Sequence, residues 1–306
     1  MKQNILLTGG AGFIGSHTAD LLIKNGYNVV IVDNLSSGSD CNINKNAKFY
    51  NLDINSPDFE KVFKENKFDY VLHFAAQPGV SFSTENPAQD ATENIIGTIN
   101  VLKHSKQYGI KKFITISTAA VYGLPEYLPV DENHKLTCLS FYGLSKLTME
   151  KYTQMFGIDY IIFRFANVYG PRQSSYGEAG VVAIFNDKMR NNEVITINGD
   201  GEQTRDFVYV EDVAKVCLLA IQSDVKNEII NVSTNKAVSV NELFKIMGEK
   251  YNYTKAPIYT EERYGDIKHS TLDNTKCRKL FDFVPKTSLE DGLSKLVESY
   301  KVGLKK

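Results

Sequence analysis

The chain has 306 residues, with 35 Lys and Arg against 36 Asp and Glu, and a formal net charge of −1. Its 42 % hydrophobic and 23 % charged residues are typical of a globular protein and exclude a largely disordered chain. The near-neutral charge argues against a nucleic-acid partner, and no apolar run approaches the ~20 residues that span a bilayer. Four scattered cysteines without a CxxC pair favour reduced thiols in the cytoplasm over disulfides or a metal site.

Short apolar segments alternate with helical patterns through the first half of the chain. These segments are continuously apolar, as in parallel strands covered on both faces. The predicted strands are 4–8, 28–32, 47–51, 70–74, 112–117 and 160–165. The predicted helices between them are 13–24, 57–66, 88–108 and 141–156. This order predicts an α/β fold, with a Rossmann-type, doubly wound parallel sheet over residues 1–166.

The pattern changes after Asn167. A stretch rich in Gly, Ser and Gln, residues 171–180, predicts a loop. Helical patterns then recur at 181–190, 210–221, 240–251 and 289–300, with only short strands among them. We therefore expect residues 167–306 to form mainly a smaller, mixed α/β substrate domain. Residues 207–234 are expected to return to the sheet domain.

Three glycines follow the first predicted strand and open the first predicted helix. Gly9, Gly12 and Gly15 allow a tight turn in which backbone amides approach a pyrophosphate at the helix N-terminus. Asp33 ends the second predicted strand, where a carboxylate binds ribose hydroxyls and repels a 2′-phosphate. The pattern therefore favours NAD over NADP. Asp53, after the third predicted strand, is placed to contact the adenine ring or, alternatively, is a turn residue.

A tyrosine and a lysine lie four residues apart on a predicted helix. Tyr142 and Lys146 share one helical face, where an ammonium group lowers the pKa of a phenol and makes it a general base. Thr118 lies at the carboxyl end of the fifth predicted strand, where doubly wound folds place their chemistry. His73, after the fourth strand, is predicted to be a packed residue rather than a base.

Several motifs in the same order make the chain resemble an extended short-chain dehydrogenase/reductase of the nucleotide-sugar epimerase/dehydratase branch. They are TGGAGFIGS (8–16), STAAVYG (117–123), YGLSK (142–146), FRFANVYGPRQ (163–173) and GDGEQTRDFVYVEDVA (199–214). The resemblance implies an N-terminal domain that holds NAD tightly and a C-terminal domain that holds a nucleoside diphosphate sugar. It implies Tyr142 as the base, Lys146 as its pKa tuner and ribose contact, and Thr118 as the hydroxyl that binds the reacting sugar oxygen.

The resemblance also implies two sets of binding residues. Besides Tyr142 and Lys146, the expected NAD contacts are Gly9, Gly12, Phe13, Ile14, Gly15, Asp33, Asn34, Ser37, Gly38, Asp53, Ile54, Phe74, Ala75, Ala76 and Asn94. The expected substrate contacts are Thr118, Asn167, Gln173, Arg205, Arg263, Asp266 and Ser270. In this set Asn167 and the two arginines contact the diphosphate, Asp266 lies near the uridine ribose, and Gln173 and Ser270 line the sugar. A metal ion is not expected.

The reaction is inferred from the residues after Thr118. Dehydratases that the chain resembles carry Asp-Glu there, and uronate decarboxylases carry a Glu before Val-Tyr-Gly, whereas this chain has Ala119 and Ala120. We therefore expect a UDP-hexose 4-epimerase that works through a 4-keto intermediate. The small Ser270, with Gln173, favours UDP-N-acetylglucosamine and UDP-N-acetylgalactosamine, and UDP-glucose and UDP-galactose stay open. The alternatives are a UDP-hexuronate 4-epimerase or decarboxylase and a 4,6-dehydratase. The resemblance further suggests a homodimer.

Overall fold

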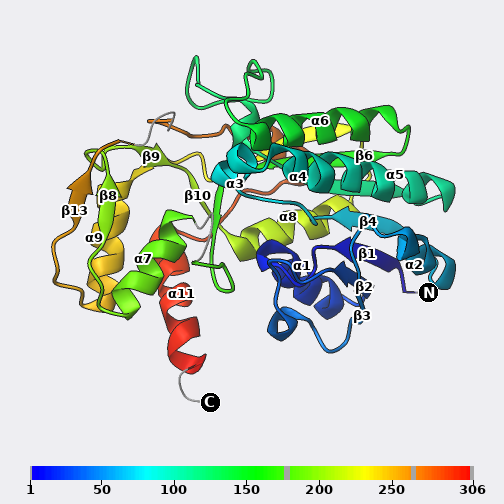
Figure 1. The fold of residues 1–306 in the computed structure, drawn as a ribbon, viewed down its shortest axis with the longest axis horizontal. Coiled ribbons are helices and arrows are strands. Elements are labelled where there is room, and N and C mark those ends of the chain that lie inside the picture. Colours follow the sequence, from blue (N-terminus) through cyan, green and yellow to red (C-terminus); the bar gives the residue numbers. More distant parts are fainter. Residues whose placement is uncertain (1, 176–179, 263–266, 304–306) are drawn as a thin grey trace.

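Seven parallel strands form the central sheet of the protein, in the order β3-β2-β1-β4-β5-β6-β11 (Figure 1). The computed structural model describes residues 2–175, 180–262 and 267–303. The strands are β1 (Asn4–Thr8), β2 (Asn28–Asp33), β3 (Lys48–Asn51), β4 (Tyr70–His73), β5 (Lys112–Thr118), β6 (Tyr160–Phe165) and β11 (Glu228–Val232). This confirms the predicted Rossmann-type sheet. Its seventh strand, β11, comes from the second half of the chain and pairs with β6.

Helices cover both faces of the sheet because its apolar side chains alternate between them. Ile5 and Leu7 of β1 pack with α1, α8 and α10 on one face, and Leu6 packs with α2 and α5 on the other. In Figure 1, α1 and α8 lie next to each other, and α5 and α6 lie together in the upper part of the picture. The helices of these layers are α1 (Phe13–Lys24), α2 (Glu60–Glu65), α3 (Val80–Glu85), α4 (Pro87–Ala91), α5 (Gly97–Gln107), α6 (Phe141–Met155), α8 (Val210–Gln222) and α10 (Thr275–Phe281).

The predicted helix at 88–108 contains a π-helical turn, η3 (Thr92–Ile96), between α4 and α5. Such turns insert one residue into a helix and are frequent at functional sites. The sequence did not predict this turn, nor α3 and α10. Three short 3-10 turns complete this half: η1 (Asp40–Asn42), η2 (Pro57–Phe59) and η4 (Ala119–Val121).

The smaller part of the molecule, at the left of Figure 1, has its own apolar core between α7, α9 and α11. Its elements are β7 (Asn167–Tyr169), α7 (Val181–Arg190), β8 (Thr196–Asn198), β9 (Thr204–Arg205), β10 (Phe207–Tyr209), β12 (Val238–Ser239), α9 (Val240–Tyr251), β13 (Ile258–Thr260) and α11 (Leu289–Gly303). The strands form three two-stranded sheets, β10-β7, β12-β9 and β13-β8.

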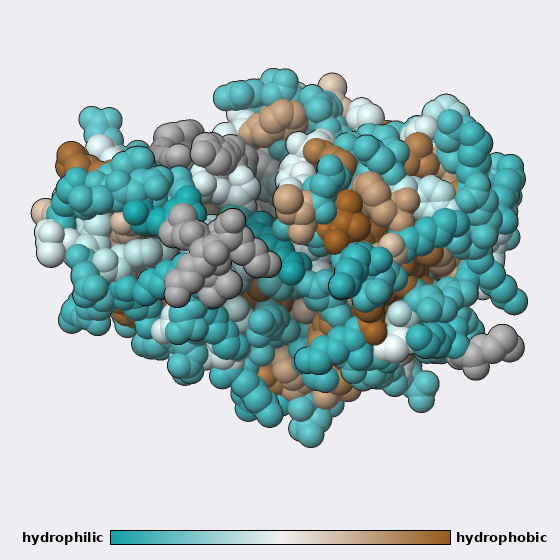
Figure 2. Space-filling model, turned by 90° about the horizontal axis from the view of Figure 1, so that it is seen from below, coloured by the Kyte–Doolittle hydropathy of each residue, from teal (hydrophilic) through white to brown (hydrophobic). Residues whose placement is uncertain are grey.

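The face seen from below is mostly hydrophilic, with brown apolar areas in small separate patches (Figure 2). Within the described part of the chain, no helix has the length and apolar character that crossing a bilayer requires.

Candidate active site

The polar side chains that the sequence singled out lie at the carboxyl ends of the parallel strands. Asp33 ends β2 and Thr118 ends β5. Doubly wound sheets bind ligands at this edge, in the crevice where the strand order reverses. Here the order reverses between β1 and β4. The glycine turn after β1 and residues 74–76 after β4 therefore border the same crevice.

The turn after β1 requires glycine at two of its positions. Gly9 has a φ of +72°, and a Cβ on it would lie 2.5 Å from the backbone nitrogen of Ala75. A Cβ on Gly15 would overlap the carbonyl oxygen of Gly9. A side chain at either place would push the turn away from β4 or away from α1.

The start of α1 has no side-chain cap and can accept an anion. Gly12 is the N-cap residue and offers no side-chain cap. The first amides of an α-helix have no intrahelical acceptor, so the N–H groups of Phe13 and Ile14 are oriented outward from the helix start. Together with the positive end of the helix dipole they suit a pyrophosphate.

Asp33 closes the turn from the side of β2. Its Oδ2 accepts from the backbone nitrogen of Ala11 at 3.0 Å, and its Oδ1 accepts from that of Leu35 at 2.9 Å. A carboxylate has about four acceptor positions, so each oxygen keeps one for a ribose hydroxyl. The exposed Asn34 donates from Nδ2 to Oδ2 of Asp53 at 2.8 Å, which ties the end of β2 to the end of β3.

The other predicted cofactor residues surround this turn. A Cβ on Gly38 would lie 3.0 Å from Ala11, so the loop that also carries the exposed Ser37 packs closely on the glycine turn. Ile54 is buried and faces Gly97 at the start of α5, where a Cβ would lie 2.6 Å from its Cδ1.

Asn94 lies in the π-helical turn η3, and its side chain joins three segments. Its Nδ2 lies 3.1 Å from the Gln77 carbonyl oxygen, 3.0 Å from Oδ1 of Asp90 and 3.0 Å from Oγ of Ser145. Its Oδ1 accepts from the backbone nitrogen of Gln77 at 2.8 Å. Asn94 thus holds the loop after β4 against α6. Its contact with a cofactor stays a prediction.

His73 is a packed residue rather than a base, as predicted. Its Nδ1 lies 2.8 Å from Oγ1 of Thr8 and its Nε2 lies 2.9 Å from Oγ1 of Thr98. Burial and, to a lesser extent, the charge of Lys146 together lower the pKa of His73 to about 3. The neutral ring therefore joins β1, β4 and α5 beneath the crevice.

The structure brings Tyr142 and Thr118 close together. Ser140 begins α6 by accepting from the backbone nitrogen of Gly143 at 3.0 Å, which places Tyr142 in the first turn. The hydroxyl of Thr118, at the end of β5, lies close enough to the Tyr142 hydroxyl to lower its pKa. Burial nevertheless dominates and raises the pKa of Tyr142 to about 12.

Lys146 follows one helical turn later and is buried. Its Nζ donates to the carbonyl oxygen of Ile116 at 3.0 Å. Burial lowers the pKa of Lys146 to about 8, against the carboxylates of Glu150 and Asp90, which raise it. The sequence predicted that Lys146 lowers the pKa of Tyr142. In the structure that pKa is raised instead, because burial dominates and Nζ is directed to a carbonyl of β5.

Of the predicted substrate residues, Asn167, Arg205 and Ser270 lie in the smaller part of the molecule. Asn167 begins β7 and is exposed. The Nη1 of Arg205, in β9, donates to the carbonyl oxygen of Lys268 at 3.3 Å. The backbone nitrogen of Ser270 donates to the carbonyl oxygen of Thr204 at 3.2 Å, so Ser270 and Arg205 lie on neighbouring segments. Arg263 and Asp266 lie outside the described residues.

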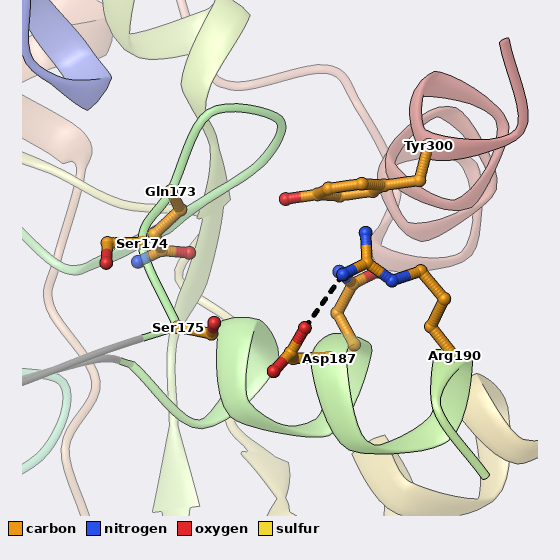
Figure 3. A pocket seen from close by; sticks show the side chains of 7 residues that line it. Gln173, Ser174, Ser175, Asp187, Arg190 and Tyr300 are labelled. Atoms are coloured by element: carbon orange, nitrogen blue, oxygen red, sulfur yellow. Dashed lines mark hydrogen bonds and ion pairs between the residues drawn. The ribbon is translucent and has the colours of Figure 1, made fainter. Parts of the chain in front are cut away.

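Gln173 lies in the loop after β7, beside a cavity of about 270 Å³ between that loop, α7 and α11 (Figure 3). Its Nε2 donates to the carbonyl oxygen of Val168 at 3.2 Å, whereas its buried Oε1 has no partner among the described residues. Figure 3 shows Tyr300 over the guanidinium group of Arg190, which pairs with Asp187 at 2.9 Å. Tyr142 does not line this cavity.

Helix α1 also holds the loop that carries Gln173. Nε2 of His17 lies 2.9 Å from the carbonyl oxygen of Pro171, and Arg172 forms an ion pair with Asp20 at 2.8 Å. The helix that begins at the glycine turn and the predicted sugar-binding loop are therefore joined directly. The sequence did not indicate this contact, which spans more than 150 residues.

A buried ion pair behind Lys146 also escaped prediction. Arg164 donates from Nε and Nη2 to the two carboxylate oxygens of Glu150 at 2.9 and 2.6 Å, and from Nη1 to the hydroxyl of Tyr122 at 3.0 Å. Tyr122 in turn donates to Oδ1 of Asn231 at 2.7 Å. The signal in the sequence was an arginine within the apolar strand 160–165.

The parallel sheet, the glycine turn after β1 and Asp33 at the end of β2 define a dinucleotide-dependent enzyme of the Rossmann type. The model of the NAD dependent epimerase/dehydratase family matches residues 5–233. The chain belongs to this family.

Individual relatives span nearly the whole chain. A putative UDP-glucose 4-epimerase of Methanocaldococcus jannaschii is 47 % identical over 97 % of this chain and 98 % of its own length. The UDP-glucose 4-epimerase of Thermotoga maritima, solved with UDP-glucose, is 46 % identical, with a TM-score of 0.95 over 99 % of this chain and 100 % of that one. A UDP-N-acetylglucosamine 4-epimerase of Methanobrevibacter ruminantium, in complex with UDP-N-acetylmuramic acid, is 36 % identical, with a TM-score of 0.93 over 99 % and 100 %.

NAD is the cofactor of this enzyme, and the chain's own groups fit it. The uncapped start of α1 suits the pyrophosphate, and the carboxylate of Asp33 suits ribose hydroxyls. The glycines of this turn carry no side chain that would separate a ligand from the backbone.

Proposed function

We propose that this enzyme interconverts the C4 epimers of a UDP-hexose and prefers the pair UDP-N-acetylglucosamine and UDP-N-acetylgalactosamine. The chain is an NAD-dependent nucleotide-sugar 4-epimerase, as its family and its relatives indicate. The proposal concerns the sugar and the residues that act on it.

The place of Thr118 at the end of β5, near Tyr142 in the first turn of α6, is the observation that carries the proposed mechanism. The Thr118 hydroxyl binds the C4 oxygen of the sugar, and the Tyr142 phenolate accepts the C4 hydroxyl proton. NAD, when bound, would supply the acceptor and then the donor of the C4 hydride, and its positive charge would oppose the burial that keeps the Tyr142 pKa high. Epimerisation requires the 4-keto sugar to present its other face to the same cofactor. Tyr142 then returns the proton to the C4 oxygen.

The turn after Thr118 favours epimerisation over elimination. Ala119–Val121 form the 3-10 turn η4, which Thr118 caps by accepting from the backbone nitrogen of Ala120 at 3.2 Å. Elimination of water across C5 and C6 needs an acid and a base near those carbons. The side chains of this turn carry neither group. The reaction that remains for the 4-keto sugar is return of the hydride to C4.

The preference for an N-acetylated sugar rests on Ser270. Its small side chain lies beside β9, the strand of Arg205, and leaves room for an acetamido group. A bulky residue at this position would exclude the acetamido group sterically and still admit a hexose without it. UDP-glucose and UDP-galactose fit the same space and are the second candidate pair, which the names of two relatives favour.

The direct test is a panel of UDP-sugars followed by proton NMR with the purified protein. We expect UDP-N-acetylglucosamine and UDP-N-acetylgalactosamine to interconvert, and the UDP-glucose pair to react more slowly. Release of carbon dioxide from UDP-glucuronate, or a stable 4-keto-6-deoxy sugar, would instead assign the chain to a decarboxylase or a dehydratase.

A Ser270→Tyr variant tests whether the size of residue 270 selects the sugar. It should lose turnover of the N-acetylated pair and keep that of UDP-glucose, because only the acetamido group needs the space. Ser270→Ala is the matched control and should turn over both pairs like the parent. Equal loss of both pairs in Ser270→Tyr would contradict the assigned role of Ser270.

We also propose that the two parts of the chain bind different ligands. Residues 1–166 with 207–234 hold NAD, and the rest of 167–306 mainly holds the sugar nucleotide. The strand pairing of β11 with β6 and the packing of α8 on the sheet support this division.

We further propose a homodimer through α5 and α6, which lie side by side in Figure 1. Leu144, Tyr152 and Met155 on α6 are exposed, as is Ile96 at the end of η3. Exposed apolar side chains along one helix face are typical of an interface. Light scattering should give twice the chain mass, and Leu144→Asp should give the monomer. A monomeric parent protein would refute the dimer.

A further inference from the structure

A buried carboxylate, Asp206, lies next to Arg205, one of the two arginines expected to bind the diphosphate. It follows β9 and is 1 % exposed. Its Oδ1 accepts from the backbone nitrogen of Thr234 at 2.9 Å and from Oγ1 of the same residue at 2.6 Å. Its Oδ2 accepts from the backbone nitrogen of Asn235 at 3.0 Å. Both carboxylate oxygens are therefore engaged by the segment that directly follows β11.

The backbone around Arg205 also holds two other residues that are expected to contact the substrate. The carbonyl oxygen of Asp206 accepts from the backbone nitrogen of Asn167 at 2.9 Å. The carbonyl oxygen of Thr204 accepts from the backbone nitrogen of Ser270 at 3.2 Å. Arg205 lies between these two carbonyl groups in the chain. The place of all three expected contacts therefore depends on where this short segment lies.

The segment that receives Asp206 is itself fixed to the central sheet. It continues from β11, which pairs with β6. Ser233 is fully buried, and its Oγ donates to the carbonyl oxygen of Leu272 at 2.7 Å. The carbonyl oxygen of Ser233 accepts from Nδ2 of Asn274 at 3.0 Å. Through its carboxylate, Asp206 thus joins the strand of Arg205 to a fixed point at the edge of the sheet.

We propose that Asp206 is a positioning residue for the diphosphate of the sugar nucleotide, which it serves by fixing Arg205 and Asn167 relative to the sheet. This inference rests on the proposed function and on the expected contacts of these two residues with the diphosphate. Hydrogen bonds from backbone N–H groups to a carboxylate are charge-assisted and stronger than neutral ones. Without them, the ligand would have to order the segment when it binds, and that cost would reduce its affinity.

The Asp206→Asn variant tests this role. The amide keeps one acceptor oxygen and replaces the other by an NH2 group, so Thr234 and Asn235 together lose at least one hydrogen-bond acceptor. We expect the Kd of UDP for the NAD-bound enzyme, measured by calorimetry, to rise about tenfold. The KM of the sugar nucleotide should rise with it. The kcat should stay within about twofold of the parent value, because the lost contacts act equally on the bound substrate and on the transition state.

Two variants of Thr234 test the same contact from its other side. Thr234→Val removes the hydroxyl that donates to Asp206 and should raise the Kd of UDP about threefold. Thr234→Ser keeps a hydroxyl and should bind UDP like the parent. This pair decides the question if Asp206→Asn does not fold.

The matched control is Asp212→Asn. Asp212 is also buried, in α8, and its Oδ2 accepts from the backbone nitrogen of Thr287 at 3.0 Å. Its replacement should leave the Kd of UDP and the KM unchanged, even where Tm falls.

An Asp206→Asn enzyme that folds and binds UDP like the parent would overturn the inference. A joint loss of kcat, NAD affinity and UDP affinity would also overturn it, since a general structural defect gives that result. Where Asp206→Asn does not fold, unchanged UDP binding in Thr234→Val has the same consequence. Failure of the proposed function is distinguishable, because the parent protein itself would then fail to bind UDP or to convert any UDP-sugar of the panel.

Discussion

Replacing Glu150 by Gln should destabilise the protein strongly, because it leaves the guanidinium group of Arg164 buried without its counter-charge. The side chains of the pair are 0 % and 2 % exposed, and the contact is bidentate at 2.9 and 2.6 Å. Removing one partner of such a pair costs about 3–5 kcal/mol. At about 2 °C per kcal/mol for a chain of this size, we expect Tm to fall by about 6–10 °C.

Thermal unfolding followed by circular dichroism measures this loss, with NAD absent so that ligand binding does not mask it. The matched control is Asp58→Asn, which breaks the exposed Lys61–Asp58 pair and should leave Tm unchanged. A double variant, Glu150→Met with Arg164→Met, should be more stable than Glu150→Gln, because it leaves no unpaired charge. A Glu150→Gln protein that melts within 2–3 °C of the parent (about 1 kcal/mol) would refute the reasoning.

Three further outcomes are expected. Tyr142→Phe should reduce kcat by about 10²–10⁴ with the Tm and NAD affinity of the parent, measured by steady-state kinetics and titration; unreduced turnover would exclude Tyr142 as the base. Gly15→Ala should abolish NAD binding in an otherwise folded chain, because its Cβ would overlap the carbonyl oxygen of Gly9. His73 has a folded pKa of about 3, below its unfolded value of 6.5. Between these two pH values the unfolded state therefore binds one more proton than the folded state. The free energy of unfolding should then decrease as the pH is lowered across that window. In His73→Asn the slope should decrease by about 1.4 kcal/mol per pH unit. An unchanged slope would mean that another group causes the acid sensitivity.

The sheet and its main helices could be predicted because their signals are local. Continuous apolar runs identified the six strands of the first half within a residue or two, and the helices at 13–24, 181–190 and 240–251 match their predicted bounds. The helix α3 escaped because six residues do not form a stable helix alone. It forms through packing, where the Oγ of Ser83 accepts from the backbone nitrogen of Tyr142 at 3.0 Å.

The candidate site could be predicted in its residues but not in its electrostatics. The four-residue spacing placed Tyr142 and Lys146 on one face of α6. Spacing alone does not say which acceptor a flexible ammonium group reaches, and here it is the carbonyl oxygen of Ile116. Nor does it reveal the π-helical turn η3, from which Nδ2 of Asn94 donates to Oγ of Ser145 in α6 at 3.0 Å.

Strand β11 is synthesised long after β6, its neighbour in the sheet, and this delay affects folding during synthesis. On the ribosome, β6 is complete 67 residues before Val232 finishes its neighbour. At roughly 5–20 residues per second, its open edge waits roughly 3–13 s for a partner. An apolar edge in a nascent chain is a template for pairing with another polypeptide, and a charge within the strand discourages it. Arg164 places such a charge within β6, and in the folded protein Glu150 neutralises it.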